Sequence, residues 1–129
     1  MRLYLSSLRT GADPDQIVAL AGGARRTALI PNALDGLSAR AREASLRRDV
    51  DDLGAAGLDV TIVNLREPGM VSRLADHDIV WIRGGNVFVL RRVLADAAAD
   101  KLLVDLVRRD AVVYGGYTTG GRPSPPRIP

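Results

Sequence analysis

The chain has 129 residues, of which 47% are hydrophobic and 26% are charged, which is typical of one globular domain and excludes an extended disordered segment. It contains no cysteine, which excludes disulfides and thiolate metal sites. The net charge of +3 arises from 18 basic residues interspersed with 15 acidic ones, so we expect no nucleic-acid partner.

Short apolar runs alternate with helical patterns along the chain. Strands are predicted over residues 2–6, 27–31, 58–64, 78–82 and 111–114. Helices are predicted over residues 14–21, 38–56, 87–99 and 101–109. This alternation favours a three-layer α/β/α fold with a mainly parallel sheet, as in flavodoxin-like proteins. Ligands of such sheets bind beyond the carboxyl ends of the strands, so the loops at that edge are the candidate sites.

A glycine pair follows the fourth predicted strand. Gly84 and Gly85 lead through Asn86 into the next predicted helix, which turns backbone N–H groups toward a ligand near the positive end of that helix. Taken alone, the pattern is more typical of glycines that serve tight packing than of an anion site. A flavodoxin-like phosphate-binding module is therefore an alternative, although the chain has neither a P-loop lysine nor a dinucleotide fingerprint.

A second glycine-rich run follows the fifth predicted strand. Residues 112–121 read Val-Val-Tyr-Gly-Gly-Tyr-Thr-Thr-Gly-Gly, a pattern that matches a nucleophile elbow, in which a sharp turn after a buried strand presents a hydroxyl group. Thr118 then occupies the nucleophile position, and the N–H of Thr119 is a candidate oxyanion donor. Taken alone, this run too is more typical of a purely structural turn.

Together the two motifs resemble those of the dipeptidase E and cyanophycinase family of serine peptidases, whose fold is related to class I glutamine amidotransferases. Further matches are Leu3 to Ser7 and Ile30 to Asp35, so the resemblance covers residues 1–120. It implies Thr118 at the nucleophile position, backbone oxyanion donors at Gly85 and Thr119, and substrate-binding roles for Gly84, Asn86 and Gly116. It implies no metal ion and no cofactor.

The resemblance also implies a substrate class, namely small peptides with a preference for an amino-terminal aspartate. The chain departs from the family at the elbow, because Thr118 stands where the family has serine and Thr119 where it usually has alanine. The family's histidine and acidic residue follow the nucleophile, whereas residues 119–129 contain neither. The only histidine, His77, precedes a predicted strand and is therefore expected at the opposite edge of the sheet.

We expect residues 1–121 to be the amino-terminal part of such a domain, followed by a proline- and arginine-rich tail at 122–129. The fold is then incomplete at its carboxyl end, and the chain alone is expected to be inactive. A non-catalytic remnant or a partner-binding α/β module is the alternative function, and a homodimer is compatible with either. The apolar start is too short for a signal peptide and no run spans a bilayer, which predicts a cytoplasmic protein without membrane contact.

Overall fold

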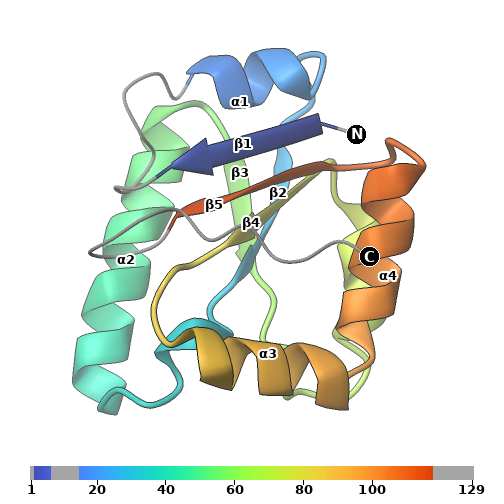
Figure 1. The fold of residues 1–129 in the computed structure, drawn as a ribbon. Coiled ribbons are helices and arrows are strands. Elements are labelled where there is room, and N and C mark those ends of the chain that lie inside the picture. The colour runs from blue at the N-terminus through green and yellow to red at the C-terminus, as the bar shows by residue number, and fades with distance from the viewer. Residues whose placement is uncertain (1, 7–14, 118–129) are drawn as a thin grey trace.

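The computed structural model describes residues 2–6 and 15–117. The strands are β1 (Arg2–Ser6), β2 (Arg26–Ile30), β3 (Asp59–Ile62), β4 (Ile79–Ile82) and β5 (Val113–Tyr117). The helices are α1 (Asp15–Leu20), α2 (Ala39–Ala55), α3 (Val87–Asp96) and α4 (Ala99–Arg108), with short 3-10 helices η1 (Asn32–Leu34) and η2 (Val71–Asp76). The described strands form one parallel sheet in the order β1-β5-β4-β2-β3 (Figure 1).

Strand β4 lies at the centre of this sheet. Its last residue, Ile82, pairs with Ile30 of β2 on one side and with Gly116 of β5 on the other. From β2 the chain continues to β3 at one edge of the sheet, whereas from β4 it continues to β5 in the opposite direction. By the general rule for parallel sheets, such a reversal marks the candidate ligand site beyond the carboxyl ends of β2 and β4, here called the crevice.

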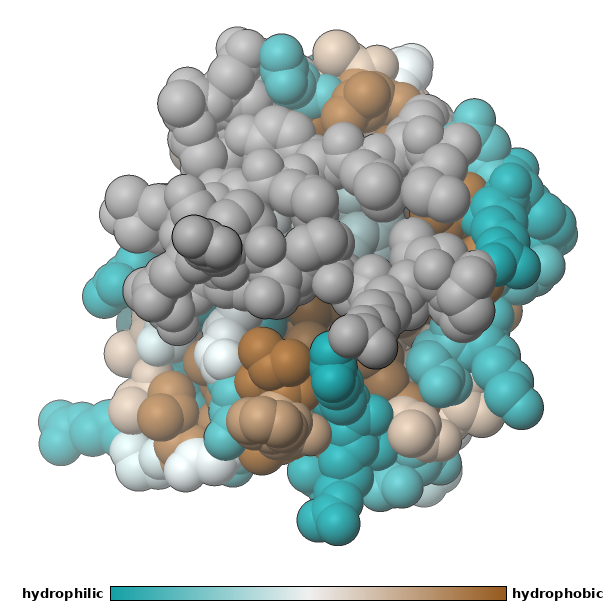
Figure 2. Space-filling model, viewed as in Figure 1, coloured by the Kyte–Doolittle hydropathy of each residue, from teal (hydrophilic) through white to brown (hydrophobic). Residues whose placement is uncertain are grey.

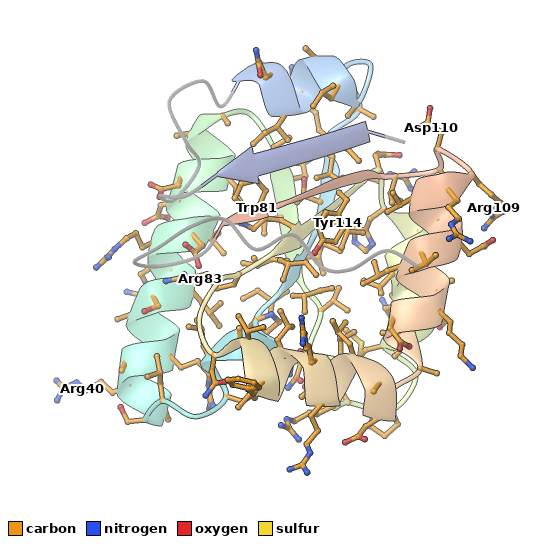
Figure 3. The ribbon with its side chains drawn as sticks, in the orientation of Figure 1. Arg40, Trp81, Arg83, Arg109, Asp110 and Tyr114 are labelled. Carbon is orange, nitrogen blue, oxygen red and sulfur yellow. The ribbon has the colours of Figure 1, made fainter. Side chains whose placement is uncertain are left out.

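The sheet separates two hydrophobic cores. Because successive side chains of a strand point to opposite faces, Trp81 packs with Ile17 of α1 and Leu53 of α2, while Tyr114 packs with Leu103 of α4. Figure 3 shows Trp81 and Tyr114 on opposite sides of the sheet, and Figure 1 shows α2 and α4 on those sides. Burial of a side chain such as Leu53 contributes about 1.5–3 kcal/mol. The predicted three-layer α/β/α fold is therefore confirmed.

Each predicted strand and helix is present, with different ends. β5 runs to Tyr117 and not only to Tyr114, because Gly115 and Gly116 continue the parallel ladder with β1 and β4. The break between α3 and α4 lies at Ala98, which adopts a left-handed conformation (φ 55°), two residues before the predicted position. The 3-10 helices were not predicted. None of the helices between residues 15 and 108 is long and apolar enough to cross a membrane.

Candidate active site

The glycine turn after β4 lies at the crevice and has tight backbone geometry. Gly85 has a φ of +155°, and a Cβ atom built on it would lie 2.7 Å from the carbonyl oxygen of Ala33 in η1. On the next residue, the backbone N–H of Asn86 donates to that same oxygen at 3.0 Å. Within the described residues the N–H of Gly85 has no hydrogen-bond partner, and Gly85 itself is exposed. The turn therefore offers a free backbone donor.

The side chain of Asn86 supports the helix that follows the turn. Its Oδ1 accepts hydrogen bonds from the backbone N–H groups of Phe88 at 3.0 Å and Val89 at 3.1 Å, which caps α3. This oxygen is thus engaged within the chain. The positive end of the helix dipole points to the same edge of the sheet as the free N–H of Gly85, which favours a ligand with negative charge or partial negative charge.

An apolar rim adjoins this turn. Phe88, in the first turn of α3, is 82% exposed, and Val87 beside it is also exposed. Figure 2 shows hydrophobic side chains gathered over the region of α3 in this view. An exposed aromatic side chain three residues after a free backbone donor offers one apolar group and one polar group, the combination that small-ligand sites use.

The second predicted motif meets the first at this edge. Gly116 is buried in β5, and a Cβ atom built on it would lie 2.7 Å from the carbonyl oxygen of Ile82, so the absence of a side chain lets β5 approach β4. β5 ends at Tyr117, one residue before Thr118, and runs parallel to β4. Both strands therefore lead into the crevice, while Thr118 and Thr119 lie outside the described residues, as does the tail at 122–129.

A buried ion pair lies directly behind the glycine turn. Arg83 is 7% exposed and Asp49 of α2 is 2% exposed, and Arg83 Nε lies 2.5 Å from Asp49 Oδ2. Arg83 Nη1 also donates to the carbonyl oxygen of Gly84 at 3.0 Å. This pair was not predicted from the sequence. The available signal was the position of Asp49 on the buried stripe of α2, three residues after Leu46 and four before Leu53.

A polar network joins the ends of β2 and β3. The fully buried Asn32 donates through Nδ2 to Asp35 Oδ2 at 2.9 Å and to Asn64 Oδ1 at 3.0 Å, and its Oδ1 accepts from the N–H of Leu65 at 3.0 Å. Arg66 Nε lies 2.6 Å from the same oxygen of Asp35. Beside the network is a groove of about 470 Å³ lined by Pro31, Asp35, Arg42, Leu46, Ile62, Asn64, Arg66 and Glu67. These bonds hold the η1 side of the crevice in place.

The histidine lies away from the crevice, as predicted. His77 caps η2 and comes two residues before β4 begins, which puts it at the amino end of that strand. Its Nδ1 lies 2.7 Å from the carbonyl oxygen of Arg73. The structure therefore separates His77 from the glycine turn by the length of β4.

The fold defines an α/β protein whose candidate ligand site lies at the carboxyl ends of β2, β4 and β5. Residues 10–122 match the model of peptidase family S51, and the chain therefore belongs to that family. The resemblance to dipeptidase E is thus confirmed.

Among solved structures, the chain is similar to a protein from Listeria monocytogenes EGD-e assigned as a peptidase E, with 22% sequence identity and a TM-score of 0.67. The likeness covers 90% of this chain and 57% of the Listeria protein, so the chain spans little more than half of that protein's length. At this identity the likeness supports the fold. No match was found among curated proteins.

Proposed function

We propose that this chain carries the nucleophile strand and the two backbone oxyanion donors of a peptidase active centre that acts on small peptides. The observation that carries the proposal is the free N–H of Gly85, which lies at the edge where β5 ends one residue before Thr118. A donor of this kind stabilises the charge that develops on a carbonyl oxygen during acyl transfer. Loss of one such donor typically costs about 3–4 kcal/mol of transition-state stabilisation.

In the proposed reaction the hydroxyl oxygen of Thr118 attacks the carbonyl carbon of the peptide bond. A base takes the hydroxyl proton, and the backbone N–H groups of Gly85 and Thr119 stabilise the resulting oxyanion. The C–N bond then breaks, the amine leaves with that proton, and water hydrolyses the acyl-enzyme. The hydroxyl of a threonine performs this step only when a base lies beside it.

In this proposal the chain does not supply the base that takes the hydroxyl proton. Residues 119–129 contain no histidine, aspartate or glutamate, and His77 lies at the amino end of β4. We therefore propose that the 129 residues alone do not turn over peptides. For the substrate we propose dipeptides with an amino-terminal aspartate, whose negative charge suits the positive end of α3.

Binding of dipeptides to the ¹⁵N-labelled chain tests the site without requiring turnover. Addition of Asp-Ala should shift the amide resonances of Gly85 and Asn86, with a weaker effect of Lys-Ala. Amides of His77 and Asp78, at the opposite edge, serve as the internal control. Absence of any shift at Gly85 at saturating peptide, or larger shifts at His77, would refute the proposed site.

Hydrolysis assays test the proposed lack of turnover. Release of amino acids from a dipeptide panel should be equal for the natural chain and for Thr118→Ala. Thr118→Ser restores the residue of the family and should also stay at background, because the base is still missing. Turnover by the natural chain that disappears in Thr118→Ala would show that a base is present after all.

A further inference from the structure

The buried ion pair between Arg83 and Asp49 connects α2 to the glycine turn. Side chains alternate along β4, so Arg83 follows Trp81 on the face covered by α2 (Figure 3), where Leu53 and its neighbours form an apolar core. Removing two charges from water carries a large desolvation cost. A pair of apolar side chains of similar size is often as stable as a buried ion pair, or more so. Stability alone therefore does not account for charged groups at these two positions.

The guanidinium of Arg83 makes a second contact that concerns the candidate oxyanion donor. Nε lies within ion-pair distance of Asp49 Oδ2, and Nη1 donates to the carbonyl oxygen of Gly84 at 3.0 Å. This carbonyl and the N–H of Gly85 belong to one peptide group, which is planar and trans. Fixing the direction of the Gly84 carbonyl therefore fixes the direction of the Gly85 N–H. Without such a contact a Gly-Gly peptide has access to several orientations.

We propose that Asp49 is a positioning residue that acts through Arg83. Its carboxylate fixes the guanidinium, and the guanidinium holds the Gly84–Gly85 peptide so that the free N–H of Gly85 points into the crevice. On the other side of the turn, the hydrogen bond from the N–H of Asn86 to Ala33 holds the chain against η1. The proposal rests on the proposed function only in naming this N–H an oxyanion donor.

A double variant separates positioning from simple stabilisation. Asp49→Leu with Arg83→Met replaces the ion pair by apolar side chains of similar volume, and its denaturation midpoint should recover relative to Asp49→Leu alone. The orientation of the Gly85 N–H bond, measured as its residual dipolar coupling, should nevertheless be lost in the double variant, with the coupling collapsing toward zero. Couplings in the central strands, at Leu29 and Val80, should stay at their natural values.

Asp49→Asn provides a second variant that keeps the size of the side chain and one acceptor oxygen. It should fold and give a Gly85 coupling between those of the natural chain and of the double variant. Glu43→Gln is the matched control, since Glu43 lies on the same helix in an exposed ion pair with Arg47 at 3.8 Å. This control should leave the coupling unchanged.

The positioning role is overturned if the residual dipolar coupling of Gly85 has the value of the natural chain in both Asp49→Asn and the double variant. The dipeptide titration described above is independent of this result. If the coupling is lost in the variants while no dipeptide binds the natural chain, the positioning role stands and the peptidase assignment fails. If dipeptides bind at Gly85 in the natural chain and equally well in the double variant with an unchanged coupling, the peptidase assignment stands and the positioning role fails.

Discussion

At the scale of single residues, two glycines matter because of what lies beside them. Side chains at Gly85 and Gly116 would collide with backbone oxygens, and a backbone atom yields far less easily than the end of a flexible side chain. Gly54, in α2, has open space around the position of a Cβ atom and no unusual φ. Alanine is therefore expected to destabilise the chain at Gly85 and Gly116 and to stabilise it at Gly54.

We expect Gly85→Ala to lower the free energy of unfolding by about 1–3 kcal/mol, since it adds a contact of 2.7 Å to a φ of +155°. Gly54→Ala should raise it by about 0.5–1 kcal/mol, because alanine restricts the unfolded chain and favours the helix. Urea denaturation of both variants measures these effects. Equal stability of Gly85→Ala and the natural chain would contradict the described turn.

Tyr114 gives a prediction for alkaline pH. Burial raises the pKa of its hydroxyl well above its usual value. The unfolded chain therefore loses this proton at about pH 10, whereas the folded chain keeps it. The contribution of the Tyr114 hydroxyl to the free energy of unfolding is fully present below about pH 10. It is progressively lost as the pH rises toward the pKa of this hydroxyl in the folded state.

Urea denaturation at rising alkaline pH, with Tyr114→Phe as the comparison, tests this expectation. The natural chain should lose stability above about pH 10 more steeply than the variant, which has no phenol at this position. Identical slopes of unfolding free energy against pH in the two proteins would show that the Tyr114 hydroxyl is not shielded from water.

At the scale of elements, the caps of two helices provide a matched pair. Asn86 caps α3 beside the glycine turn, and Ser38 caps α2 with its Oγ 3.2 Å from the N–H of Ala41. Replacement of either residue by alanine should cost about 1 kcal/mol of unfolding free energy. Only Asn86→Ala should also shift the amide resonance of Gly85. A comparable shift in Ser38→Ala would indicate that the turn responds to general destabilisation.

The polar network that joins the ends of β2 and β3 gives a second prediction at this scale. Asn32→Leu leaves the buried N–H of Leu65 without its acceptor and removes the donor to Asp35 and Asn64. We expect a loss of about 2–3 kcal/mol of unfolding free energy, as for buried polar groups deprived of partners. Thr61→Ala, at an exposed position of β3, should stay within about 0.5 kcal/mol of the natural chain. Equal stabilities of the two variants would contradict the network.

At the scale of the whole molecule, the sequence predicted the elements and the fold class because both depend on local periodicity. The buried runs of β2 and β4, and the stripe on α2, have the periods of strands and helices. The strand order was not predicted, since β1 pairs with β5 through contacts more than a hundred residues apart in the chain. The sequence around Arg83 does not predict Asp49 as its ion-pair partner, because the two residues lie on different layers of the fold.

Within the candidate site, the glycine turn was predicted because glycine, Asn cap and helix follow one another in the sequence. The role of the Gly85 N–H as an oxyanion donor is implied by the family resemblance and stays a prediction. The contact of Arg83 with the carbonyl of Gly84 was not predicted, because it depends on tertiary packing. The position of His77 followed from the rule that parallel strands present their two ends at opposite edges of the sheet.

The proposed active centre requires that residue 118 faces the glycine turn. Because the chain has no cysteine, pairs of introduced cysteines report on this directly. The four residues of β4 span about 13 Å, so the cross-linker should be a dimaleimide shorter than this length. It should link Thr118→Cys to Val87→Cys, at the start of α3, much faster than it links Thr118→Cys to Asp76→Cys, before β4. Equal rates, or faster linkage to residue 76, would contradict the shared edge and with it the proposed active centre.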